Sequence, residues 1–256
     1  MSELKIDNPA QRLLDLLEQG NEYQRDDNCR KVWQKILQVE DMEEQHLLTR
    51  LACAMALPGR IIQVREDNFS TLRGKSNHWK SHVDTAFVSQ SLNDGWHTFR
   101  DNIDDRTLTE LGMLSDLFET RGAHAGIAAE EIDDLLERIT QLRSEIRESG
   151  LSATMKTLLL KQLAQIQEAL ESYSISGVEP VMDAVQSTLG LAVLHPEYRN
   201  EISKGTGSLF GDKISTLYTI LCKCLFSEVT VQAVTELDNK AAHRHTPVPQ
   251  RHCPFL

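Results

Sequence analysis

Glycine, proline and aromatic side chains are all scarce in this chain. Its 256 residues include 13 glycines and 7 prolines, and Phe, Trp and Tyr together make up 5%. An all-β chain needs many turns, which Gly and Pro supply, so this scarcity argues against that class. Apolar residues still make up 40% of the chain, which is enough to build a buried core and argues against a disordered chain.

Basic side chains are fewer than acidic ones. Lys and Arg number 27 against 38 Asp and Glu, so the formal net charge is −11. Proteins that bind nucleic acid regardless of its sequence do so through positive surface charge. General nucleic-acid binding is therefore not expected, although a local basic patch remains compatible with this balance.

The cysteines are few, odd in number and scattered, which excludes a disulfide framework. They are Cys29, Cys53, Cys222, Cys224 and Cys253. Residues 1–7 contain neither the basic nor the apolar segment of a secretory signal. We therefore expect reduced thiols and a cytoplasmic location.

Common signatures of nucleotide binding, hydrolysis and thiol redox chemistry are absent. The sequence has no Gly-x-x-x-x-Gly-Lys-Ser/Thr, Gly-x-Gly-x-x-Gly, Gly-x-Ser-x-Gly or Cys-x-x-Cys pattern. No cofactor is predicted. No metal site is predicted either, because the histidines and cysteine of the last residues match no zinc spacing. Those residues are His243, His245, His252 and Cys253.

Apolar residues recur at helical spacing along most of the chain, which predicts an all-α multi-helix bundle. Asn8-Pro9 is typical of a helix start, and Gly20 is predicted to end that helix. Another helix is expected from Glu43 to Pro58. The four residues 61–64 fit a helix or a strand equally well.

Two apolar heptad seams form the clearest pattern. The first runs Ile132, Leu135, Ile139, Leu142 and Ile146, and the second runs Met155, Leu159, Leu163, Ile166, Leu170 and Tyr173. Residues 149–152 interrupt them, which predicts a long antiparallel helical hairpin. The predicted interaction residues are Leu135, Ile139, Leu142, Leu159, Leu163 and Ile166.

The chain divides into three predicted parts. Residues 1–125 form an N-terminal helical bundle, and residues 126–240 form the hairpin and C-terminal helices, packed separately or as one domain with the first part. Residues 241–256 contain three prolines and no acidic side chain, which predicts a flexible tail.

One basic stretch offers a catalytic alternative. Arg73 and His78 are separated by four residues, and Lys75, Lys80 and His82 add positive charge nearby. A metal-independent ribonuclease needs a base for the 2′-hydroxyl and a cation for the phosphate. The spacing resembles the Arg-x(4–6)-His signature of HEPN-type ribonucleases, which implies a helical fold and catalysis by Arg73 and His78. An exposed basic loop is the alternative interpretation.

The apolar stretch 214–234 offers a second alternative. Lys223 and Glu228 interrupt it, and each is costly at a bilayer centre. The stretch therefore favours a helix in a core or partner interface, while a membrane-perturbing effector is the alternative.

The run from Ile132 to Val185 resembles a helical region of uncharacterised bacterial proteins, and the resemblance extends over residues 30–190. It rests on the two heptad arms, the break at 149–152 and the turn at 173–177. It implies a role in phage defence or inter-bacterial conflict and transfers no catalytic residue. Together with the seams, it predicts a non-enzymatic interaction or regulatory protein that self-associates or serves as a subunit.

Overall fold

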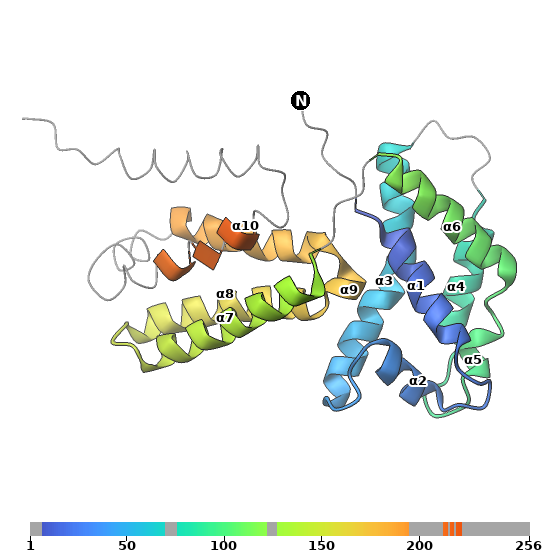
Figure 1. The fold of residues 1–256 in the computed structure, drawn as a ribbon, viewed down its shortest axis with the longest axis horizontal. Coiled ribbons are helices and arrows are strands. Elements are labelled where there is room, and N and C mark those ends of the chain that lie inside the picture. Colours follow the sequence, from blue (N-terminus) through green and yellow to red (C-terminus); the bar gives the residue numbers. More distant parts are fainter. Residues whose placement is uncertain are drawn as a thin grey trace, which may run out of the picture.

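The computed structural model describes residues 7–69, 76–121, 127–194, 212–214, 216–217 and 219–221. Within these ranges the regular structure is entirely helical, apart from one isolated bridge between Asn28 and Gly95. Figure 1 shows two groups of helices side by side along the long axis. The predicted all-α multi-helix bundle is confirmed.

The first group, which we call the first bundle, contains six helices in the described residues. They are α1 (Pro9–Asn21), α2 (Cys29–Ile36), α3 (Glu44–Asn68), α4 (His78–Ser89), α5 (His97–Arg100) and α6 (Asp105–Glu119). α1 lies between α3 and α6 and packs against both (Figure 1). The centre is aromatic, because the Trp33 ring contacts Trp96 and Phe99 edge to face at 5.3 Å and 5.0 Å.

The start of α1 is as predicted, and its end is one residue later. The Asn8 side chain accepts a hydrogen bond from the Gln11 amide at 3.1 Å, and Pro9 opens the helix. Gly20 lies inside the last turn, buried beneath the Trp96 indole. Packing against this ring, rather than helix termination, is therefore the role of Gly20.

The predicted end of a helix at Pro58 is wrong. α3 continues through Pro58 to Asn68, so residues 61–64 are helical. Pro58 removes one backbone donor, but the buried stripe of α3 continues beyond it through Ile61 and Arg65. Packing of this stripe against the rest of the bundle outweighs the local cost of the proline.

The second group, which we call the hairpin unit, begins with α7 (Ala129–Glu148) and α8 (Ala153–Glu171), the predicted antiparallel hairpin. The Ser152 hydroxyl caps α8 by accepting from the Met155 amide at 3.3 Å. A short α9 (Tyr173–Ser176) and α10 (Val178–Leu194) follow, and α10 packs along α8 (Figure 1).

Each group has its own hydrophobic cluster. The connection between them runs through α9, because Ile175 packs in the cluster of the first bundle. Arg12 Nε donates to the Ile175 carbonyl at 3.0 Å, and Arg60 Nη1 donates to the Ser176 carbonyl at 2.6 Å. The division at residue 125 stays a prediction, and the predicted tail 241–256 lies outside the described residues.

Candidate functional site

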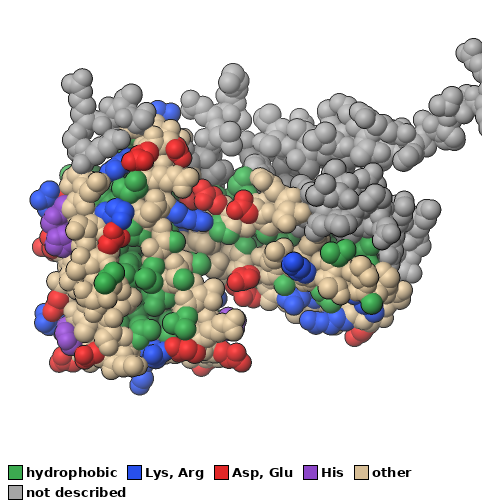
Figure 2. Space-filling model, turned by 180° about the vertical axis from the view of Figure 1, so that it is seen from behind, with side chains coloured by type: hydrophobic (Ala, Val, Ile, Leu, Met, Phe, Trp, Pro, Cys, Tyr) green, Lys and Arg blue, Asp and Glu red, His purple; other side chains and the backbone are tan. Residues whose placement is uncertain are grey.

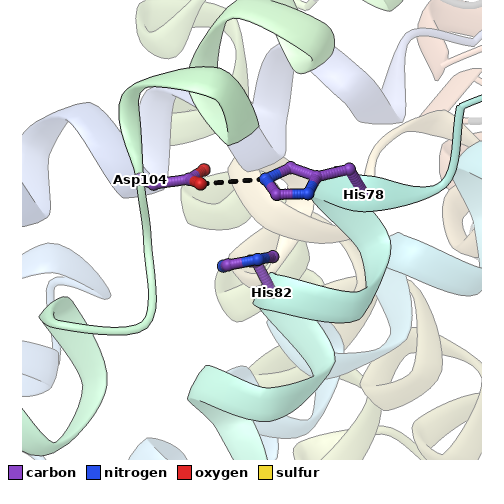
Figure 3. A group of neighbouring side chains, drawn as sticks. All are labelled: His78, His82 and Asp104. Carbon is purple, nitrogen blue, oxygen red and sulfur yellow. Dashed lines mark hydrogen bonds and ion pairs between the residues drawn. The ribbon is translucent and has the colours of Figure 1, made fainter.

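Two histidines and an aspartate gather at the N-terminal end of α4. His78 and His82 lie one turn apart on that helix, and Asp104 comes from the connection that leads into α6 (Figure 3). One ligand atom from each residue lies within 4.8 Å of the others. His78 Nε2 is 2.9 Å from Asp104 Oδ2, and the two imidazole rings lie 4.1 Å apart.

Asp104 is fixed by its role as the N-cap of α6. Its Oδ1 accepts from the Thr107 hydroxyl at 2.6 Å and from the Thr107 amide at 2.8 Å. The Thr107 hydroxyl, then the Thr107 amide and His78, hold the pKa of Asp104 well below its usual range. The carboxylate is therefore ionised at neutral pH, with Oδ2 directed at the imidazole.

His82 is oriented by the backbone of the same connection. Its Nδ1 lies 2.9 Å from the Asn102 carbonyl oxygen. A carbonyl only accepts, so Nδ1 carries a proton, and in the neutral tautomer with this proton Nε2 has the lone pair. His82 thus presents a fixed ring with one nitrogen free to act as an acceptor or a ligand.

Two cationic side chains close in sequence to this cluster are each paired with a carboxylate. Lys80 pairs with Asp84 along α4, and Arg106 Nε is 2.9 Å from Glu110 Oε1 along α6. Ser76 donates to the same Glu110 carboxylate at 2.8 Å. The neighbouring cations are thus neutralised beside the cluster.

Of the predicted catalytic pair, the structure places only His78 in this cluster. Arg73 lies outside the described residues, so the ribonuclease hypothesis stays a prediction. His82 was predicted only to add positive charge near His78, and Asp104 was not predicted to join them. The spacing of four between His78 and His82 was the available signal, because such histidines share a helix face. The sequence alone does not bring Asp104 to them.

The six predicted interaction residues all lie inside the hairpin unit. The largest exposed fraction among them is 6%, at Leu142. Their side chains belong to the second hydrophobic cluster and pack α7 against α8. They are Leu135, Ile139, Leu142, Leu159, Leu163 and Ile166. In this structure the seams pack the hairpin unit itself, and a role of these six residues in binding a partner stays a prediction.

A third heptad-spaced set lies on α3, and all of its members except the partly buried Ile62 are exposed. Its spacing is 4, 3, 4, 3, and its members are Leu48, Ala52, Met55, Gly59 and Ile62. We call this set the α3 seam. Leu48 is 49% exposed and Met55 is 46% exposed. Seen from behind, hydrophobic side chains gather over part of the first bundle (Figure 2).

The α3 seam was hidden in the sequence because α3 has two apolar faces. Leu47 and Leu51 of the buried face stand next to Leu48 and Ala52 of the exposed one, so the sequence alone does not separate the two faces. Among the described residues, α3 is the one helix that is long and apolar enough to span a membrane by length and composition. A third of that apolar window is buried, and the buried helices of folded cores meet the same criteria.

The stretch 214–234 lies mostly outside the described residues. Of its described side chains, Ile214, Leu217 and Leu221 are buried in the hydrophobic cluster of the hairpin unit. The start of this stretch therefore packs inside the protein, and the membrane-perturbing alternative stays a prediction.

Comparisons with protein-family models, with curated proteins and with solved structures found no match to this chain. The resemblance to helical bacterial proteins, with the role in defence or conflict that it implies, accordingly stays a prediction.

Proposed function

We propose that this chain is a non-enzymatic helical interaction protein that self-associates through the α3 seam. One observation carries the proposal: apolar residues at heptad spacing are exposed on a helix whose opposite face is buried in the first bundle. Heptad-spaced apolar residues pack against a second helix as knobs into holes. A helix of this kind is therefore half of a helix–helix contact.

The composition of the seam favours a second copy of the chain as its occupant. Every exposed residue of α3 between Leu48 and Gln63 is uncharged. The half-buried Arg50 and Arg60 are held by backbone carbonyls, Arg50 by that of Leu37 at 2.7 Å and Arg60 by that of Ser176. Charges beside a seam select unlike partners and oppose like ones. Because this seam lacks them, two identical seams can meet around a twofold axis without local repulsion.

A lipid surface fits the same face less well. Helices that lie on membranes carry Lys and Arg beside the apolar face and are attracted to anionic lipids. The exposed α3 face carries no such charge over this stretch, and the whole chain has a net charge of −11. A membrane is therefore the less favoured occupant of this face, and vesicle binding is one outcome of the experiment below.

The experiment is sedimentation equilibrium of the full chain from about 1 µM to several hundred µM, a range suited to a small interface. We expect a monomer–dimer equilibrium that Met55→Glu abolishes, because it places two carboxylates within the contact. Met113→Glu is the matched control, since Met113 is 66% exposed on α6. Circular dichroism establishes that both variants keep their helices.

The salt dependence gives a second expectation. Two chains of charge −11 repel at long range, so added salt should tighten the dimer by screening that repulsion. A wild-type chain that stays monomeric over the whole range overturns the proposal, as does a dimer that is unaffected by Met55→Glu. Binding of the monomer to neutral vesicles through the same face would assign the α3 seam to lipid instead.

A further inference from the structure

We propose that His78, His82 and Asp104 form a binding site for one divalent transition-metal ion, for which Zn²⁺ is the first probe. This site is independent of the proposed self-association. It lies where α4 meets the connection to α6, whereas the α3 seam lies on another helix (Figures 1 and 3).

The distances within the cluster are close to those of a metal site. Zinc ligands lie about 2.0–2.2 Å from the ion, so two of them in a tetrahedron are about 3.4 Å apart. Here the ligand atoms lie within 4.8 Å of one another, and the His78–Asp104 pair is at 2.9 Å. Small side-chain rotations bring all three to one ion, which would replace the direct contact between His78 and Asp104.

His82 and Asp104 already make the supporting hydrogen bonds that metal ligands use. A ligating histidine donates its second ring nitrogen to a carbonyl or carboxylate, which fixes the ring and its tautomer. His82 does this through Nδ1 to the Asn102 carbonyl at 2.9 Å. Asp104 is held on one oxygen by Thr107, at 2.6 Å and 2.8 Å, so its other oxygen is directed at the site. This pre-orientation is the second observation behind the proposal.

The donor set and its surroundings fit a divalent transition metal. Two imidazoles and one carboxylate are ligands of zinc and of iron(II), and three protein ligands leave positions for water. The side chains of His78 and Asp104 are 25% and 44% exposed, so an ion can reach them from solvent. Lys80 and Arg106 are paired with Asp84 and Glu110 and leave the approaching cation unopposed.

The residues between His78 and His82 do not match the motif of zinc proteases. The stretch His78-Trp79-Lys80-Ser81-His82 lacks the Glu that follows the first His in the His-Glu-x-x-His motif of zinc proteases. We therefore propose that the site binds an ion that joins α4 to the start of α6, and we propose no protease activity. Such an ion stabilises the folded chain by RT ln(1 + c/Kd), which grows with the concentration c of free ion.

The test uses the full chain, stripped with a chelator and titrated with Co²⁺ followed by its visible absorption, then with Zn²⁺ in competition. We expect one ion per chain, and a melting temperature that rises with Zn²⁺. His82→Asn and Asp104→Asn should each weaken binding by at least about 10-fold. Asp104→Asn keeps an oxygen that can cap α6, and metal-free melting of each variant shows that it folds.

Two controls separate this site from other histidines. His46→Asn removes an exposed imidazole from α3 and should leave binding unchanged. A variant without His243, His245, His252 and Cys253 tests the C-terminal residues, and it should also bind as the wild type does. The proposal fails if the stripped chain binds no ion, if the cluster variants bind as the wild type does, or if the C-terminal variant alone loses the ion.

Discussion

The indole of Trp96 lies directly on the backbone of Gly20. Its Nε1 donates a 2.8 Å hydrogen bond to the Gly20 carbonyl, and a Cβ at residue 20 would lie 2.9 Å from Cζ2 of the ring. Trp96 is 1% exposed and also stacks on Phe99 at 4.9 Å. The absence of a side chain at Gly20 is thus what lets the aromatic core reach the last turn of α1.

Gly20→Ala should destabilise the first bundle. Alanine favours a helix over glycine by about 1 kcal/mol, but overpacking a core costs about 1–3 kcal/mol, so we expect a net loss of up to about 2 kcal/mol. Gly112→Ala on α6 is the control, because its Cβ would meet Leu14 at an ordinary 3.9 Å. Urea unfolding should place Gly20→Ala below the wild type and Gly112→Ala at or above it. Equal stability of Gly20→Ala and wild type would contradict the packing argument.

Gly177→Ala should weaken the connection between the first bundle and the hairpin unit. Gly177 has φ +76° and ψ −160°, a conformation nearly confined to glycine, and its Cβ would lie 2.6 Å from the Arg12 guanidinium. Arg12 is also paired with Asp7 at 2.6 Å, so it is not free to move away. A loss of about 1–3 kcal/mol in the free energy of unfolding is expected.

Gly150→Ala is the matched change for Gly177, since a Cβ at Gly150 meets nothing within 4 Å. It should leave stability within about 0.5 kcal/mol of the wild type. If both alanine variants lost the same stability, the backbone conformation and the Arg12 contact would not be the cause.

Ile139→Asn tests whether the hairpin seams serve the fold. Ile139 is fully buried between α7 and α8, so an amide there removes apolar contacts and is left without partners. The free energy of unfolding should fall by about 3 kcal/mol or more, and the variant should lose its helicity at a lower temperature than the wild type. Thr140→Asn changes the adjacent exposed residue and should have little effect. Unchanged stability of Ile139→Asn would contradict the structural role of the seams.

These cases show what sequence periodicity could and could not predict. The hairpin was predictable because its stripes are regular and a capping serine separates its arms, so local signals agree with the final packing. α3 was predicted too short because Pro58 is a local signal, whereas its continuation depends on distant packing partners. His82 was within reach of a spacing argument, but Asp104 joins it only through the tertiary fold.

The thiol of Cys29 should make stability depend on pH in the alkaline range. Burial raises its pKa from an ordinary value of 9.0 to about 11. Burial therefore outweighs the position of Cys29 as the first residue of α2, where a helix N-terminus lowers the pKa of a thiol. Between these values the unfolded chain has lost the proton and the folded chain retains it, so stability falls as the pH rises. This stability is fully present below pH 9, and up to about 3 kcal/mol of it is lost as the pH rises through 11. Unfolding of wild type and Cys29→Ala at several pH values should show a shallower decline in the variant; parallel declines would mean that Cys29 is not the group responsible.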